Sequence, residues 1–408
     1  MLARKMALTQ KVPILVAGVV LVFLAQGAWA AQYKVLHRFK TYGEEPSRLI
    51  FDTAGNLYGT TSGGGAGTVG TVFRLSPNGQ GNWTASVLHS FARDGHDGYE
   101  PLGGVTFDSS GELYGTTTQG GAQGGGTVFK LTPHANGKWT ETVIYSFGNG
   151  NWPQSDLIFD SMGNLYGTTV YGGPDSAGTV FQLVPHGDGT WTENQLFAFD
   201  NKNGYNPYAG VVFDTAGNLY GTTEFGGAGH RGVVFQLSPN GGGGWTERVL
   251  HSFIKGSLDG FQPIAGLTVD ASGNLLGTTY RGGRHGDFGT VFKLTPGGNG
   301  SWQETLLHSF DNNRKDGFAP TSGVTFDNAG NLYGTTAKGG ANGGFGTVFK
   351  LTPSANGRWS ETILHSFGND PGASTPVFGV VFDGSGNLYG PSLGSGQHPL
   401  GAIFEITP

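Results

Sequence analysis

Short apolar segments alternate with polar turns along this chain, and one order of segments recurs seven times. In the fourth recurrence, residues 210–214, 218–223, 232–237 and 245–253 have the composition of strands, and the stretch 224–231 is a longer loop. The last segment alternates apolar and polar positions, and none carries a helical period of useful length. Four short antiparallel strands per repeat are typical of one propeller blade.

A recurring phrase marks each repeat. An Asp is followed by G-N-L-Y-G-T-T or a close variant, at a spacing of 52 to 57 residues. Single positions drift, with Glu112, Leu276 and Pro391-Ser392 as examples. The repeated acids are Asp52, Asp108, Asp160, Asp214, Asp270, Asp327 and Asp383. A period this regular indicates an array of equivalent units.

The two ends of the chain indicate that this array closes. Residues 33–39 match the fourth strand of other repeats, as in 249–253, whereas residues 401–406 match a third strand. The N-terminal strand would therefore complete the last blade and leave no open end. We predict an all-β fold, a seven-bladed β-propeller with four antiparallel strands per blade, formed by residues 31–408 as a single domain.

These repeats resemble the GloVer tandem-repeat family of exported bacterial proteins, also described as choice-of-anchor repeat proteins. The resemblance rests on residues 323–327, 330–336, 339–340 and 346–353 and their equivalents in all seven units. It implies export and a propeller-like fold, and it implies no particular activity or catalytic residue. The chain shows none of the varied C-terminal anchors of that family.

The first 30 residues predict a signal peptide. Basic residues precede an apolar run at 12–25, and Ala28-Trp29-Ala30 has the form of a cleavage site. The alternative is a retained anchor, but the run is shorter than the ~20 residues of a membrane-spanning helix. We expect cleavage after Ala30, no membrane insertion afterwards, and a monomer in the periplasm or outside the cell.

Composition excludes some chemistry. With no cysteine, the chain has no disulfide and no thiolate site. A net charge of −6 disfavours nucleic acid as a partner. We expect no cofactor and no metal, since each repeated Asp is better explained by an Asx-type turn than by a calcium loop. Five histidines occupy one slot of the fourth strand, where Tyr145 and Phe197 stand in the other two repeats, and this indicates packing. They are His37, His89, His251, His308 and His365.

Loops that follow the second strand share one face with the links between blades, and only these loops vary. Polar residues that differ from the repeat consensus gather there in repeats four to six. The alternative interpretation is a solvated surface with scattered charges. The candidate ligand-binding residues are Glu224, His230, Arg231, Tyr280, Arg281, Arg284, His285, Asp287 and Arg314. Arg and His side chains suit carboxylate or sulfate groups.

The links carry a motif Asp/Asn-Gly-aromatic-x-Pro, as in residues 97–101, 203–207, 259–263 and 316–320, with Trp152-Pro153 as a variant. The rings could stack on sugars, but the sequence favours rings that plug the seams between blades.

Without a catalytic signature, the sequence favours non-catalytic binding of a glycan or an envelope protein on the variable face. One alternative is a lyase acting on an acidic polysaccharide, for which His230, Tyr280, Arg284 and His285 offer the cation and the base. A second alternative is a passive structural platform in envelope assembly.

Overall fold

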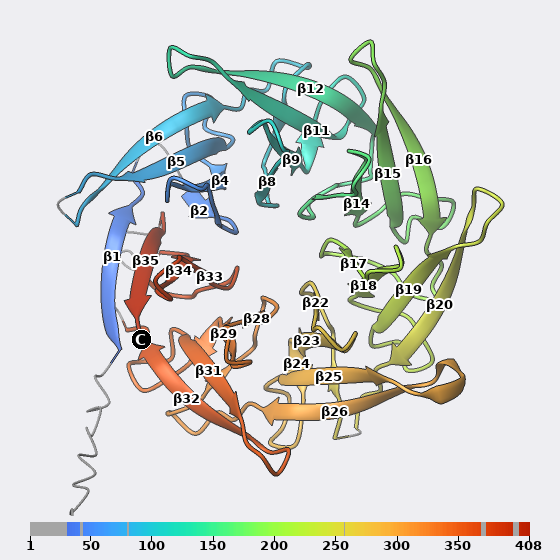
Figure 1. Cartoon of the computed structure of the whole chain (residues 1–408), viewed down its shortest axis with the longest axis vertical. Coiled ribbons are helices and arrows are strands. Elements are labelled where there is room, and N and C mark those ends of the chain that lie inside the picture. The colour runs from blue at the N-terminus through green and yellow to red at the C-terminus, as the bar shows by residue number, and fades with distance from the viewer. Residues whose placement is uncertain (1–30, 41–43, 80, 257, 369–372, 395–399) are drawn as a thin grey trace, which may run out of the picture. The chain divides into compact units, whose positions relative to one another are not determined.

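Each repeat folds into four antiparallel strands, and the seven repeats form blades around a central channel (Figure 1). The computed structural model describes residues 31–40, 44–79, 81–256, 258–368, 373–394 and 400–408, and residues 31–408 form one compact unit. The predicted seven-bladed propeller is confirmed. The predicted signal peptide, 1–30, lies outside the described residues, and the described part contains no helix with the length and hydropathy of a membrane span.

The first two strands of each blade lie nearest the channel. The innermost strands, in order of blades 1 to 7, are β3 (Ile50–Phe51), β8 (Val105–Phe107), β13 (Ile158–Phe159), β17 (Val212–Phe213), β22 (Thr268–Val269), β28 (Thr325–Phe326) and β33 (Val381–Phe382). The second strands are β4 (Leu57–Gly63), β9 (Leu113–Thr117), β14 (Leu165–Thr169), β18 (Leu219–Thr223), β23 (Leu275–Thr279), β29 (Leu332–Thr336) and β34 (Leu388–Ser392).

The third and fourth strands are longer and lie towards the rim. The third strands are β5 (Thr71–Pro77), β11 (Gly124–Pro133), β15 (Thr179–Pro185), β19 (Val233–Pro239), β25 (Thr290–Pro296), β31 (Thr347–Pro353) and β35 (Ala402–Thr407). The outer strands are β6 (Trp83–Ser90), β12 (Trp139–Gly148), β16 (Trp191–Ala198), β20 (Trp245–Ser252), β26 (Trp302–Ser309), β32 (Trp359–Ser366) and, in blade 7, β1 (Gln32–Arg38).

The ring closes through β1, as predicted from the ends of the chain. β1 pairs antiparallel with β35, from Gln32 opposite Thr407 to Arg38 opposite Ala402. The N–H of Phe39 then donates to the carbonyl of Gly401 at 3.0 Å. Blade 7 is therefore assembled from both ends of the described chain.

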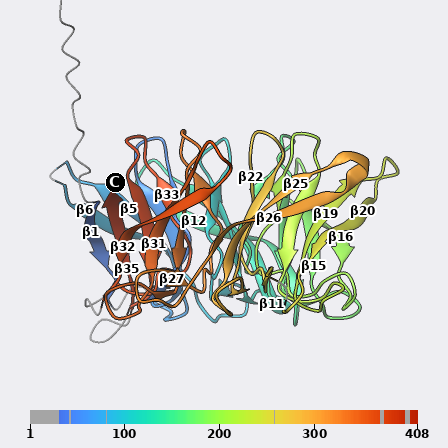
Figure 2. The ribbon, with the colours of Figure 1, turned by 90° about the horizontal axis from the view of Figure 1, so that it is seen from below.

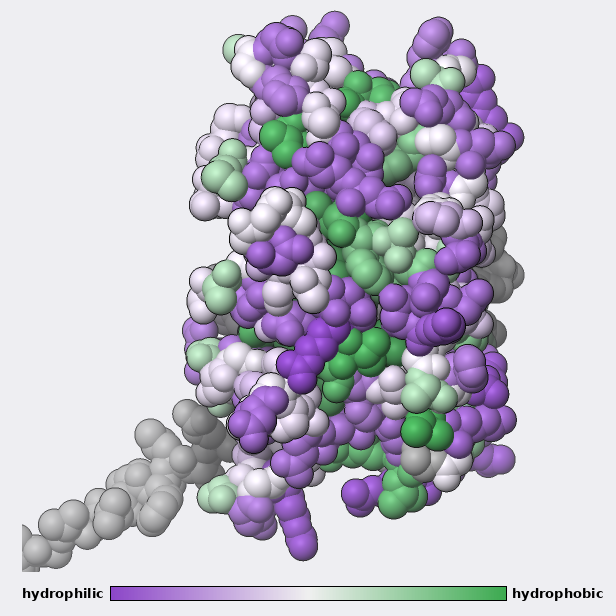
Figure 3. All heavy atoms as spheres, turned by 90° about the vertical axis from the view of Figure 1, so that its right-hand side faces the viewer, coloured by the Kyte–Doolittle hydropathy of each residue, from purple (hydrophilic) through white to green (hydrophobic). Residues whose placement is uncertain are grey.

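The hydrophobic core lies in the seams between neighbouring blades. Seven clusters of buried residues form it, and each combines side chains of two blades. In the seam between blades 3 and 4, the rings of Phe199 and Phe235 make an edge contact with centroids 5.0 Å apart. Figure 3 shows the same arrangement at the rim, where apolar patches lie in recesses between hydrophilic surfaces.

The glycine of the repeated L-Y-G-T-T strand is needed for this packing. A Cβ on Gly221 would lie 2.5 Å from Cζ of Phe235, which is closer than real contacts allow. We expect Gly221→Ala to lower the free energy of unfolding by about 1–3 kcal/mol through overpacking. Chemical denaturation would measure it, with Gly242→Ala as control, because nothing lies closer than 3.7 Å to a Cβ there. Equal midpoints for the two variants would contradict this explanation.

Short strands mark the variable face. The links between blades contain β2 (Glu44–Pro46), β7 (Gly98–Tyr99), β21 (Gly260–Phe261) and β27 (Gly317–Phe318), and the loops after second strands contain β10 (Gln119–Gly120), β24 (Arg281–Gly282) and β30 (Lys338–Gly339). In Figure 2, β27 lies at the lower face, while the hairpin between β25 and β26, with the 3-10 turn Gly298–Gly300, lies at the upper face.

Candidate functional site

The repeated Asp residues are structural centres of the turns on the uniform face. Oδ1 of Asp214 accepts the backbone N–H groups of Ala216 and Asn218, and Oδ2 accepts Asn218 Nδ2 and the Tyr220 hydroxyl, all within 2.7–2.9 Å. These hydrogen bonds hold the pKa of Asp214 below its usual value. Both oxygens are thus engaged by the turn, as the Asx-type interpretation requires.

On the opposite face, one residue of every link has a strained backbone. The residue before the link proline has φ between 53° and 59° in all seven links, although residues before proline normally have an extended backbone. These residues are Glu45, Glu100, Trp152, Asn206, Gln262, Ala319 and Thr375. At Trp152 the N–H donates to Gly125 and the carbonyl accepts from Val170, so the backbone bridges blades 2 and 3. The backbone position is the same in every link, whereas six residue types occupy it, with glutamate in two links.

An aromatic group begins at this position. Trp152 is 43% exposed, and its ring makes an edge contact with Tyr171 at a centroid distance of 5.3 Å. Tyr208 lies beside Tyr171 in the next blade, and the pKa of its hydroxyl is raised by burial, by the Glu224 carboxylate and by Tyr171. Three aromatic side chains therefore lead across the variable face from blade 3 to Glu224 of blade 4.

Polar groups continue the same line. Nε2 of Gln262, another residue that precedes a link proline, donates to Oε1 of Glu224 at 3.1 Å. Burial raises the pKa of the Glu224 carboxyl, while Arg281 and the Gln262 hydrogen bond act in the opposite direction. Arg281 is exposed, with its guanidinium carbon 5.7 Å from the centre of the Tyr280 ring. We call Trp152, Tyr171, Tyr208, Glu224, Gln262 and Arg281 the Trp152–Arg281 strip.

The structure brings together only part of the predicted site. Glu224 and Arg281 belong to the strip, and Tyr280 lies beneath Arg281. Arg231 is half-buried, with its guanidinium 5.5 Å from the centre of the Phe261 ring. Exposed positions of the loops and of the link between blades 5 and 6 hold the rest: His230, Arg284, His285, Asp287 and Arg314. Among the described residues, no hydrogen bond or ion pair joins the side chains of the four residues considered for a lyase.

Trp152, Tyr171, Tyr208 and Gln262 were missed by the sequence analysis. The predicted link motif was Asp/Asn-Gly-aromatic-x-Pro, with Trp152-Pro153 as a variant, and its rings were expected to plug the seams. The motif rings do lie at seams, since Phe261 is buried and Tyr205 stacks on Phe225 at 5.1 Å. The sequence did contain a signal for these residues at the position before the link proline. The proline is present in every link, whereas the residue type before it changes, as expected of a position that contacts a ligand.

The strip borders the central channel through Tyr208. The channel has a volume of about 300 Å³ and is lined mainly by the residues that lead into the inner strands. Nη1 of Arg48 in blade 1 lies 2.9 Å from Oδ2 of Asp156 in blade 3, and Oδ1 of Asp156 accepts the N–H of Gly104 in blade 2. Three blades are thus tied together beside the strip.

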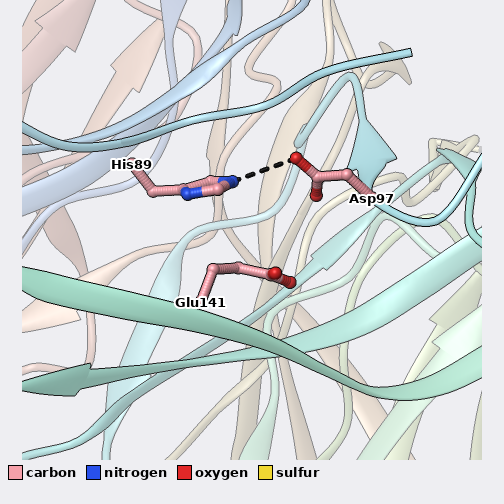
Figure 4. A group of neighbouring side chains, drawn as sticks. All are labelled: His89, Asp97 and Glu141. Carbon is pink, nitrogen blue, oxygen red and sulfur yellow. Dashed lines mark hydrogen bonds and ion pairs between the residues drawn. The ribbon is translucent and has the colours of Figure 1, made fainter. Parts of the chain in front are cut away.

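Three of the repeated histidines take part in a second kind of cluster, at the seams. His89 of β6 contributes Nε2, which lies 3.1 Å from Oδ2 of Asp97, and Glu141 of β12 extends its carboxylate below them (Figure 4). The seam between blades 4 and 5 repeats this set with His251, Asp259 and Glu304, and the next seam repeats it with His308, Asp316 and Glu361. In each set, one donor atom per residue lies within 4.8 Å of the others.

Burial sets the acidity of these glutamates. It raises the pKa of Glu141 to about 7, with a further contribution from Asp97. Burial and the adjacent Asp259 raise the pKa of Glu304, and burial and Asp316 raise that of Glu361. The sequence analysis did not connect these residues, because each set combines two blades and the link between them.

Among solved structures, propellers of larger proteins are similar to this chain. The extracellular domain of a hybrid two component system from B. thetaiotaomicron has a TM-score of 0.57 at 10% identity, covering 91% of this chain and 39% of that one. An ancestral GH74 enzyme has a TM-score of 0.57 at 12% identity (90% and 48% covered). PorZ, a surface component of the type-IX secretion system of Porphyromonas gingivalis, has a TM-score of 0.51 at 15% identity, and the match covers 90% of this chain and 47% of PorZ.

At these identities the likeness concerns the fold alone. The chain spans between about two fifths and one half of the length of these three proteins. A comparison with curated proteins finds no match. The repeat itself does match a known family: the Gloeobacter/Verrucomicrobia repeat covers residues 18–215, 80–287 and 211–408 in three overlapping stretches. This confirms the resemblance drawn from the repeated motifs, and the chain belongs to the Gloeobacter/Verrucomicrobia repeat family.

Proposed function

We propose that this protein is exported and that it binds an acidic glycan, without cleaving it, along the Trp152–Arg281 strip. The observation that carries the proposal is Trp152, a large aromatic side chain that is 43% exposed on a backbone hydrogen-bonded to two blades. The Tyr171 ring in edge contact with Trp152 enlarges the aromatic surface that is offered to a ligand. The apolar face of a sugar ring packs well on an aromatic ring.

The polar half of the strip suits the acidic groups of such a glycan. The Arg281 guanidinium is exposed and can form paired hydrogen bonds with a carboxylate. Glu224 and Gln262 present acceptor and donor groups to sugar hydroxyls. The rings and the guanidinium lie on three neighbouring blades, which suits a chain of sugar units better than a single small molecule.

Two features support binding rather than cleavage. The strip holds one carboxylate, Glu224, whereas glycosidases of the common type place two on either side of the scissile bond. Of the four residues considered for a lyase, His230, Arg284 and His285 occupy exposed loop positions outside the strip, and Tyr280 lies half-buried beneath Arg281. Export rests on the basic start, the apolar run and the Ala28-Trp29-Ala30 site of the sequence.

Titration calorimetry with uronate, sulfated and neutral oligosaccharides tests the proposal. We expect Trp152→Ala to weaken binding of the retained glycan at least about tenfold, which is about 1.4 kcal/mol. Arg281→Ala should weaken binding of the uronate more than that of the neutral sugar. Lys338→Ala is the matched control, because Lys338 occupies the same position in blade 6. Unchanged affinity of the Trp152 variant, or release of unsaturated sugars, would contradict the proposal.

A further inference from the structure

The seams between blades contain a chemistry that glycan binding does not use. In three of them a histidine and a glutamate of neighbouring outer strands converge with an aspartate of the link, and none of these residues belongs to the Trp152–Arg281 strip. The sets are His89, Asp97 and Glu141; His251, Asp259 and Glu304; and His308, Asp316 and Glu361. All nine residues are buried or half-buried.

Each set leaves two carboxylate oxygens without a hydrogen-bond partner. Oδ1 of Asp316 and Oε1 of Glu361 are inaccessible and have no hydrogen-bond partner, although Oε1 of Glu361 lies 3.5 Å from Nε2 of His308. The same two atoms lack a hydrogen bond in the other two sets, and Oε1 of Glu247 lacks one in a seam without histidine. The Asp316 side chain is only 8% exposed. Its Oδ2 binds His308 Nε2 and the N–H of Asp311, so the free oxygen is the one left for another group. Figure 4 shows the equivalent oxygen of Asp97 turned towards Glu141.

Unpaired buried carboxylate oxygens are costly. One such pair could be tolerated as an exception, but the arrangement occurs three times with the same residue types and the same free atoms. A cation between the two oxygens and the imidazole would satisfy both carboxylates and offset their charge.

The other seams hold only parts of this set. The seams between blades 2 and 3 and between blades 3 and 4 keep the glutamate, as Glu193 and Glu247. They have Tyr145 and Phe197 in the histidine slot, and Asn149 and Asn203 replace the aspartate. The seams with His37 and His365 have Ala85 and Tyr33 at the glutamate position, and the ring of Tyr33 stacks on that of His365. Among the described residues, the complete set of one imidazole and two carboxylates occurs in three seams.

We propose that each of these three seams binds a divalent transition-metal cation of the Zn²⁺ type through one imidazole nitrogen and two carboxylate oxygens. Nitrogen and oxygen donors together suit zinc, whereas calcium prefers six to eight oxygens. Donor atoms within 4.8 Å of one another can surround one ion. Because the ligands come from adjacent blades, the metal would connect neighbouring blades near the rim and stabilise the ring.

Metal analysis of the purified protein after loading with Zn²⁺ and gel filtration tests this inference. We expect three zinc ions per chain, and a loss of one with each of Asp97→Asn, Asp259→Asn and Asp316→Asn. The controls are Glu193→Gln and Glu247→Gln, which alter the seams without histidine and should leave the zinc content unchanged. Chelation should lower the melting temperature of the loaded wild type and leave that of the triple Asp→Asn variant unchanged.

Absence of retained zinc, or zinc content that is unaffected by the three Asp→Asn substitutions, would overturn the inference. In the first case the carboxylates share protons instead, and in the second the zinc lies elsewhere on the protein. Each single variant changes one seam and leaves two intact, so a failure of the triple variant to fold does not remove the test. None of these residues belongs to the strip, and glycan binding can therefore fail independently.

Discussion

A chain without residues 31–40 should not form a stable propeller. Its blade 7 would keep three strands, and the edge of β35 would be open to solvent and to other chains. The deletion also removes Phe39, which is 95% buried between blades 7 and 1. Removal of one buried Phe side chain costs about 3–5 kcal/mol. Adding the lost strand pairing brings the expected loss close to the whole stability of a typical domain, about 5–15 kcal/mol.

Moving the strand distinguishes ring closure from a general effect of truncation. In a permuted chain, residues 31–40 would follow Pro408 through a turn copied from residues 240–244, which connect β19 to β20. This variant should melt cooperatively near the wild-type temperature, while the simple deletion should show no cooperative transition. Thermal unfolding followed by circular dichroism gives the comparison. A deletion that melts like the full chain would show that the ring does not depend on β1.

Asp214→Ala should cost about 2–4 kcal/mol of unfolding free energy, because a charged acceptor of four hydrogen bonds is lost. The hydroxyl of Tyr220, a residue only 5% exposed, loses its carboxylate partner. Urea denaturation measures the loss. Asp188→Ala is the control, since this exposed hairpin aspartate bonds only with Thr190. Equal midpoints of the two variants would contradict the structural role of the turn.

The same substitution should change how stability depends on pH. Asp52, Asp160, Asp214, Asp327 and Asp383 all have a pKa held below the ordinary value of 3.8 by the turn hydrogen bonds. Such a group stabilises the fold above its unfolded pKa, and the contribution is lost as pH falls through the folded pKa. Between pH 7 and pH 5 the difference between wild type and Asp214→Ala should be constant, and below pH 4 it should shrink.

Most of the fold could be predicted from the sequence because the same local sequence pattern occurs seven times. The glycine of L-Y-G-T-T, the Asp turn and the alternation of 245–253 each specify a strand or a turn by themselves. Closure through β1 also followed from local similarity, since residues 33–39 and 249–253 share a pattern. None of these predictions required knowledge of contacts between distant residues.

The candidate site was only partly predictable for a related reason. Glu224 and Arg281 differ from the repeat consensus and were therefore predicted as site residues. Which of these non-consensus residues form one binding surface depends on their solvent exposure and on the side chains beside them, and the sequence does not show either. Trp152 looked like one more seam-filling ring until the positive φ of its backbone and its 43% exposure were known. His89, Asp97 and Glu141 meet only because blade 2 packs against blade 1, and a single repeat contains no complete set.

The most direct test of the account is a crystal structure of the protein with a uronate oligosaccharide that it retains. We expect an uncleaved sugar chain on the variable face, with one sugar ring packed on Trp152 or Tyr171 and a carboxylate at the Arg281 guanidinium. A sugar bound around His230 and His285 instead, or the products of its cleavage in the structure, would contradict it.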